Sequence, residues 1–270
     1  MEDAAAPVLL VGQPVEGAAL HEIGRGRAAV FSAACPGRAG NEDAAALIPL
    51  DEGSAVLAVA DGLGSTPLAD RAASLAVRAL VDALHPGLRA GSLLRTAILN
   101  GIERANQAVT ALGAGAATTL TVAEVQEDVV RPYQVGDSVL LLVGQRGRIK
   151  YQSTAHSPVG FALESGLLDE GEALRHADRH LVSNVLGSRD MHIELGPTLR
   201  LAPRDTLLLA SDGLADNLRR REIADRIRRG PLAESARLLA ADAQRRMAAP
   251  APGEPSKPDD LTFVLFRLRV

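Results

Sequence analysis

The sequence is poor in aromatic residues and in cysteine. Only 2% of its 270 residues are aromatic and tryptophan is absent, so the 47% apolar content must pack a core made mostly of Ala, Leu, Val and Ile. The single cysteine, Cys35, excludes an internal disulfide and any multi-cysteine zinc site. A lone thiol is typical of a protein in a reducing cytosol.

The sequence also lacks a basic excess and a long apolar run. Lys and Arg number 29 against 33 Asp and Glu, and no basic segment is interleaved with aromatics, so we expect no nucleic-acid partner. No apolar stretch approaches the roughly 18 residues of a membrane span, so we expect no membrane partner. The chain starts Met-Glu-Asp without the basic flank of a signal peptide, and we therefore expect a cytoplasmic protein.

One stretch, AVLAVADGLGS at residues 55–65, organises the pattern around it. Its first six residues are short and apolar, which predicts a strand buried on both faces that ends at Asp61 and Gly62. Apolar residues at helical spacing then predict a helix over 69–84, which His85-Pro86-Gly87 is expected to end. The same spacing predicts further outer helices over 92–112 and 232–247.

The remaining apolar runs predict a largely antiparallel strand set. Residues 1–27 read as a loose lead-in with room for one edge strand, and 157–180 as an irregular, mobile surface flap. Predicted strands cover 28–34, 44–50, 118–125, 129–135, 139–143, 206–210 and 261–268. The three runs between 118 and 143 favour a meander. Only one strand follows the Pro-rich segment 249–258, and it must pair with earlier strands, so we interpret 1–270 as a single domain.

Acidic residues stand at the ends of several predicted strands. Two apolar strands end in Asp-Gly, at Asp61 and Asp212, and the last begins at Asp259. If that strand is antiparallel to the others, the three carboxylates meet at one sheet edge, within reach of Glu42 and Asp43. Each aspartate alone could be an ordinary turn former.

Clustered carboxylates need a compensating cation. Like charges about 4 Å apart repel by roughly 4 kcal/mol at an effective dielectric near 20. The available ligands are oxygen donors without paired His or Cys, which favours Mg²⁺ or Mn²⁺. More than one bridging acid would favour a two-metal site, and such sites activate a shared water for displacement at phosphorus.

Six short motifs in this order resemble the metal-dependent protein phosphatases of the 2C type, in their bacterial serine/threonine form. They cover about residues 28–268, and each falls at a predicted turn. The motifs are Arg38-x-x-Asn41-Glu42-Asp43, Ala60-Asp61-Gly62-Leu63-Gly64, Thr118-Thr119-Leu120, Val135-Gly136-Asp137-Ser138, Ser211-Asp212-Gly213-Leu214 with Asp216, and Asp259-Asp260-Leu261-Thr262.

The resemblance implies roles for individual residues. Asp61 would bridge two Mn²⁺ or Mg²⁺ ions, with the Gly62 carbonyl on one, while Asp212 and Asp259 bind the other. Glu42 and Asp43 would hold metal-bound waters. A third, weaker site would use Asp137 and Asp216. Arg38 would grip the substrate phosphate, as a planar guanidinium can do with two hydrogen bonds.

We interpret the chain as an α+β protein, a four-layer αββα sandwich of two antiparallel β-sheets flanked by helix pairs. The implied activity is hydrolysis of phosphoserine and phosphothreonine in proteins by a hydroxide bridging two ions. The implied partners are phosphorylated proteins, substrates of a cognate Ser/Thr kinase.

Two alternatives stay open at this point. One is a non-catalytic phosphoprotein-binding or regulatory module with the same fold, and the other is an enzyme acting on phosphorylated small molecules. Asp260 replaces the family's Asn and could compete with Asp259 as a ligand. The histidines are interpreted as packing or surface residues, with His156 nearest the cleft.

Overall fold

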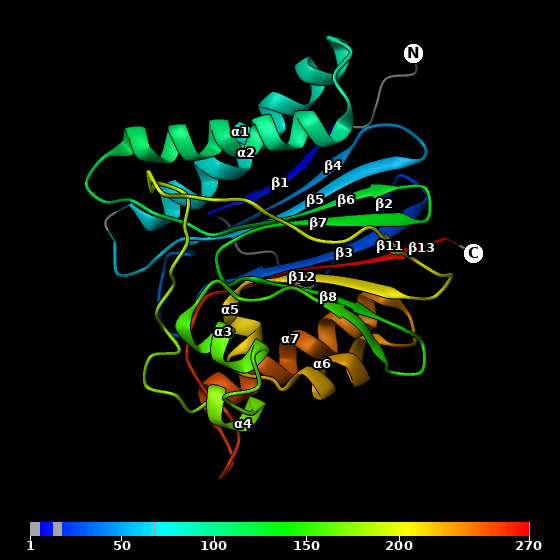
Figure 1. Cartoon of the computed structure of the whole chain (residues 1–270). Coiled ribbons are helices and arrows are strands. Elements are labelled where there is room, and N and C mark those ends of the chain that lie inside the picture. The colour runs from blue at the N-terminus through cyan, green and yellow to red at the C-terminus, as the bar shows by residue number, and fades with distance from the viewer. Residues whose placement is uncertain (1–5, 13–17, 67, 270) are drawn as a thin grey trace.

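The structure is a computed structural model that describes residues 6–12, 18–66 and 68–269. Within these residues, two antiparallel sheets pack face to face, and helices cover the outer face of each (Figure 1). This arrangement confirms the predicted αββα sandwich.

The first sheet carries the central strand and lies beneath one helix pair. Helices α1 (Ala69–Arg89) and α2 (Leu94–Leu112) cover its outer face (Figure 1). Its described strands run in the order β1 (Val8–Val11), β4 (Asp43–Pro49), β5 (Ser54–Asp61), β6 (Leu120–Gln126), β7 (Val129–Val135) and β10 (Glu194–Leu195), with β11 (Leu199–Arg200) also pairing with β7.

The second sheet holds the last strand of the chain at its centre. Helices α6 (Arg220–Ile227) and α7 (Leu232–Ala248) cover it. The described strands run in the order β2 (Ala19–Ile23), β3 (Gly26–Ala33), β13 (Leu261–Leu268), β12 (Thr206–Ala210), β8 (Val139–Val143) and β9 (Ile149–Gln152). Three short helices lie in connections: α3 (Pro158–Glu164), α4 (Glu170–Ala173) and α5 (Asp212–Ala215).

Strand β5 is buried on both faces, as predicted. Val56, Ala58 and Ala60 belong to the cluster under α1 and α2. Leu57 and Val59 alternate with them and belong to the cluster between the two sheets. A strand with period-two alternation between two apolar layers has no polar face, which explains its continuous Val, Ala and Leu sequence.

Two sequence expectations about element order and length are wrong. The runs at 118–143 do not form one meander: β6 pairs with β7, but β8 lies in the second sheet between β12 and β9. Both faces of β8 are buried, so its sequence fits a central strand of either sheet. Helix α1 also passes through Pro86 and ends at Arg89.

The helix tolerates Pro86 because the proline stands in its last turn. Proline removes one backbone donor, but its own carbonyl still accepts the N–H of Ala90 at 3.0 Å. Leu88, beyond the proline, packs against the core under the helices. Burial of that side chain favours one further helical turn.

The N-terminal segment contributes two edge strands, one to each sheet, where the sequence suggested a loose lead-in with one. β1 pairs with β4 in the first sheet and β2 with β3 in the second. Residues 1–5 and 13–17 of this segment lie outside the described residues. The single-domain organisation of 1–270 stays a prediction, as does the mobility of the segment 157–180, which contains α3 and α4.

Candidate active site

The strand ends that carry acids meet at one end of the sandwich. β13 runs antiparallel to β12, so Asp259, just before β13, lies near Asp212, just after β12. In the first sheet Asp43 stands directly opposite Asp61 on the neighbouring strand. The antiparallel placement of the last strand is therefore confirmed.

Most of the predicted site residues line one cleft with a volume of about 310 Å³. Seven of the nine predicted site residues are on its wall: Arg38, Glu42, Asp61, Gly62, Asp137, Asp212 and Asp259. Asp43 lies buried, where the Ser211 hydroxyl donates to its Oδ2 at 2.8 Å. Asp216 lines an adjoining cavity of about 130 Å³ that Asp137 and Asp212 share.

The two Asp-Gly turns bring backbone close to backbone. A Cβ at Gly62 would collide with the carbonyl of Ala69, and one at Gly213 with the carbonyl of Asp260. Only glycine fits such approaches. The glycine of each turn therefore allows α1 to start beside β5 and α5 to lie against the segment that leads into β13.

Burial and mutual repulsion make the carboxylates hard to ionise together. Burial, then the charges of the neighbouring aspartates, raises the pKa of Asp61 well above its usual value. The same causes raise the pKa of Asp137 to about 8 and that of Asp216 to about 6. Clustered acids that resist ionisation in a cleft indicate a place where positive charge is expected.

The donor chemistry of the cleft fits a hard divalent cation. Its predicted ligands are all oxygens, and Oδ1 of Asp43 is buried without a hydrogen-bond partner among the described residues. Over that same part of the chain, however, no three His, Cys, Asp or Glu side chains are arranged as a ready metal cage.

An ammonium group stands among the acids instead. Lys257 Nζ lies 2.5 Å from Asp212 Oδ2, 3.0 Å from Asp259 Oδ2 and 3.1 Å from Asp216 Oδ2. Although burial opposes its charge, these carboxylates raise the pKa of Lys257, so the amine is protonated. The site thus carries a positive charge from its own chain.

Comparison with known proteins assigns the chain to a family. A sequence profile described as protein phosphatase 2C matches residues 38–248, which is more than half of the chain. The chain belongs to the protein phosphatase 2C family. The members of this family are metal-dependent phosphatases that use Mn²⁺ or Mg²⁺.

Curated relatives of this 2C phosphatase are bacterial. The serine/threonine phosphatase stp of Listeria welshimeri is 27% identical over 194 residues, covering 68% of this chain and 76% of the relative. The protein phosphatase PhpP of Streptococcus pneumoniae is 30% identical over 183 residues, covering 64% of this chain and 72% of the relative.

Solved structures share the whole sandwich. The Mycobacterium tuberculosis serine/threonine phosphatase PstP/Ppp superposes with a TM-score of 0.74 at 26% identity, covering 91% of this chain and 99% of that one. The catalytic domain of PstP in complex with two manganese ions gives a TM-score of 0.72 at 25% identity and the same coverage.

In this 2C phosphatase, Asp260 does not compete with Asp259, which corrects the sequence expectation. Its two carboxylate oxygens accept the backbone N–H groups of Cys35 at 2.6 Å and Glu42 at 2.5 Å. Asp260 is 4% exposed and does not line the cleft. It fixes the loop that carries Arg38 and Glu42.

Sequence reasoning missed Lys257 and the residue that holds it. Asn217 is fully buried, accepts the Lys257 backbone N–H at 2.9 Å and donates to the Lys257 carbonyl at 2.8 Å. The spacing Lys257-Pro258-Asp259 was a usable signal, because residues i and i+2 of an extended chain point to the same side. His156, by contrast, is buried and packs as interpreted.

Proposed function

We infer that this chain is a metal-dependent phosphatase that hydrolyses phosphoserine and phosphothreonine in proteins. The observation that carries this proposal is the convergence of Asp61, Asp212 and Asp259 in one cleft. Membership of the 2C family and relatives called serine/threonine phosphatases support it.

The residue roles within the cleft are part of the proposal. Asp61, the Gly62 carbonyl, Asp212 and Asp259 would hold two Mn²⁺ or Mg²⁺ ions, with Glu42 and Asp43 orienting water beside them. Such ions lower the pKa of water and offset the charge that develops on the transferred phosphoryl group. Asp137 and Asp216, which share a cavity wall with Asp212, would form a third and weaker site.

Arg38 would bind the substrate phosphate at the mouth of the cleft. Its side chain is 60% exposed, and its Nη1 lies 3.6 Å from Glu42 Oε2. A weak contact of this length leaves the guanidinium free to turn toward a ligand. A phosphate monoester offers the paired oxygens that suit its planar fork.

Of the two alternatives from the sequence, the relatives disfavour one, and the other needs an experiment. The non-catalytic binding module is not favoured, because the matched relatives are named as phosphatases. The choice between protein and small-molecule phosphates is settled by comparing phosphopeptides with metabolite phosphates at equal concentration in Mn²⁺. We expect phosphoserine and phosphothreonine peptides to give the higher kcat/KM, and a preference for metabolites would overturn the protein-substrate assignment.

Phosphorylated proteins are the expected substrates, and we propose that a cognate Ser/Thr kinase supplies them. We also propose a cytoplasmic location. None of the helices in the described part of the chain has the length and apolar content of a bilayer-crossing segment.

A further inference from the structure

Lys257 places a positive charge among the acids of the cleft. Its ammonium contacts three carboxylates from two segments: Asp212 and Asp216 in and just after α5, and Asp259 before β13. An ammonium is a compact point charge with three donors, so one Lys can engage three separate carboxylates.

Lysine is rare in this sequence, so a lysine among these carboxylates is a departure from the usual basic residue of the chain. The 29 basic Lys and Arg residues include only two lysines, Lys150 and Lys257. All the other basic residues are arginines. The planar guanidinium of arginine suits a single carboxylate, and it is too wide to take the place of a small ion.

The backbone around Lys257 is held firmly. Asn217 binds both its N–H and its carbonyl, and donates further to the Gly213 carbonyl at 2.8 Å. The backbone carbonyl of Asn217 in turn accepts from Arg246 Nη1 at 2.9 Å.

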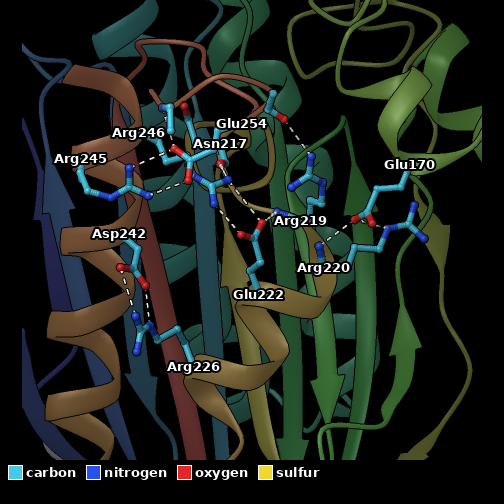
Figure 2. A network of polar contacts seen from close by, with 12 residues as sticks. Glu170, Asn217, Arg219, Arg220, Glu222, Arg226, Asp242, Arg245, Arg246 and Glu254 are labelled. Carbon is cyan, nitrogen blue, oxygen red and sulfur yellow. Dashed lines mark hydrogen bonds and ion pairs between the residues drawn. The ribbon is translucent and has the colours of Figure 1, made fainter. Parts of the chain in front are cut away.

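Figure 2 shows the ion-pair network beside this clamp. Arg246, which is 4% exposed, lies between Glu222 and Glu254, with its Nε 3.2 Å from Glu254 Oε1. Arg245 makes two further bonds to Glu254, at 3.0 and 3.1 Å. The Pro-rich segment 249–258 is therefore anchored to α6 and α7, and the Lys257 backbone has a fixed place.

The Lys257 side chain has more freedom than its backbone. It is 22% exposed and lines the same cleft as Asp61 and Arg38. It can leave the carboxylates by rotating its side-chain bonds into the cleft, without breaking the Asn217 clamp.

We propose that Lys257 is a built-in counter-ion that holds Asp212, Asp216 and Asp259 together and must be displaced before a divalent ion binds there. This inference rests on the proposed function, because it takes these carboxylates as metal ligands. It assigns Lys257 a positioning role that sets metal affinity, and it makes the phosphatase respond only at metal concentrations sufficient to expel the ammonium.

The first experiment follows the lysine itself. Metal-free protein is treated briefly with an amine-acylating reagent, with and without Mg²⁺, and acylation is quantified by mass spectrometry. We expect acylation of Lys257 to rise severalfold with Mg²⁺. Lys150, paired with Asp205 at 2.5 Å, is an internal control that stays constant. Saturating Mg²⁺ that leaves Lys257 acylation unchanged would overturn the proposal.

The second experiment measures Mn²⁺ binding by calorimetry, without any turnover. If the ammonium holds the carboxylates for nine-tenths of the time or more, Lys257→Met binds Mn²⁺ about tenfold or more tightly than the wild type. Lys150→Met is the matched control with unchanged affinity. Equal affinity in Lys257→Met and wild type, or no Mn²⁺ binding by either, would reject the inference.

The two readouts separate this inference from the proposed function. Metal-driven exposure of Lys257 and tighter binding by Lys257→Met would support displacement even if no phosphopeptide were hydrolysed. Phosphatase activity with unchanged acylation would leave the function standing and remove the role of Lys257. If Lys257→Met does not fold, the acylation of wild-type protein still decides.

Discussion

The carboxylate of Asp260 accepts the backbone N–H of Glu42 at 2.5 Å, across a separation of 218 residues. Its other oxygen accepts the N–H of Cys35, so a single side chain beside β13 fixes both ends of the loop between β3 and β4. The loop that presents Arg38 to the cleft therefore depends on a residue that is not itself at the cleft.

Replacing Asp260 tests this dependence. Asp260→Ala leaves the buried N–H of Cys35 and the partly buried N–H of Glu42 unpaired and is expected to lower the free energy of unfolding by about 2–4 kcal/mol. Asp260→Asn keeps one acceptor oxygen and should lose about half as much. Urea unfolding of both variants measures the difference. Equal stability of Asp260→Ala and wild type would show that the loop is held in another way.

Replacement of a central acid should abolish activity without lowering the stability of the metal-free protein. Burial and neighbouring charges raise the pKa of Asp61 in the folded protein. The free energy of unfolding therefore falls as the pH rises above 3.8, the ordinary pKa of an aspartate. In metal-free buffer at pH 7.5, Asp61→Asn is therefore expected to unfold at a Tm equal to or above that of the wild type.

The same variant should be inactive. Loss of a ligand that contributes several kcal/mol to the transition state lowers kcat by roughly 10²-fold or more. Steady-state assay and thermal unfolding of Asp61→Ala, Asp61→Asn and Asp212→Ala check the two expectations together. Activity that persists in both Asp61→Ala and Asp212→Ala would show that the site is assigned wrongly.

Arg38 is expected to act on phosphate binding alone. Arg38→Ala removes charge-assisted hydrogen bonds worth about 1.5–3 kcal/mol, which lowers kcat/KM by roughly 10- to 150-fold. Arg38→Lys keeps the charge but not the fork and should recover part of that loss. Mn²⁺ affinity, measured by calorimetry, should stay unchanged, and a large fall in it would mean that Arg38 supports the acids instead.

Most strands were predictable from the sequence because their apolar runs are short and bounded by turns. The sheet that each strand joins was not predictable, as β8 shows, because a strand buried on both faces fits either sheet. The end of α1 was missed because the burial of Leu88 outweighs the missing donor of Pro86.

Asp61, Asp212 and Asp259 were predictable as a group because each stands at the end or the start of an apolar strand with a glycine or a second acid beside it, whereas Asp137 and Asp216 were proposed only from the family resemblance. Asp260 was misjudged because its sequence position is that of a ligand neighbour, whereas its partners, Cys35 and Glu42, lie more than 200 residues away. Lys257 was missed since its position among the acids depends on the clamp by Asn217, which is a tertiary contact.

His156 should make stability depend on pH. Its Nδ1 accepts from the Gly136 backbone at 3.2 Å and from Asn184 Nδ2 at 2.8 Å, so its Nε2–H donates to Glu194 at 2.9 Å. Protonation of Nδ1 would point its new N–H at the two groups that donate to it, the Gly136 N–H and the Asn184 amide. Burial accordingly lowers the pKa of His156, with the His192 ring opposing its charge and Glu194 favouring it.

A buried histidine that stays neutral contributes its full stabilisation to the folded protein above 6.5, the pKa of histidine in the unfolded chain. This stabilisation is lost as the pH falls below that value. We expect the Tm difference between wild type and His156→Gln to shrink from pH 7.5 to pH 5. The acids of the cleft titrate in both proteins and cancel in the difference. A difference that is constant or grows toward pH 5 would contradict the assigned tautomer.

The central claim is that acids from distant parts of the chain form one divalent-ion site that hydrolyses phosphoproteins. The most direct measurement is phosphate release from a phosphothreonine peptide by chelator-treated protein during a Mn²⁺ titration. The account predicts no release without metal, saturable release as Mn²⁺ is added, and none at any concentration with Asp212→Ala. Release that is indifferent to chelator, or absent throughout the titration, would contradict it.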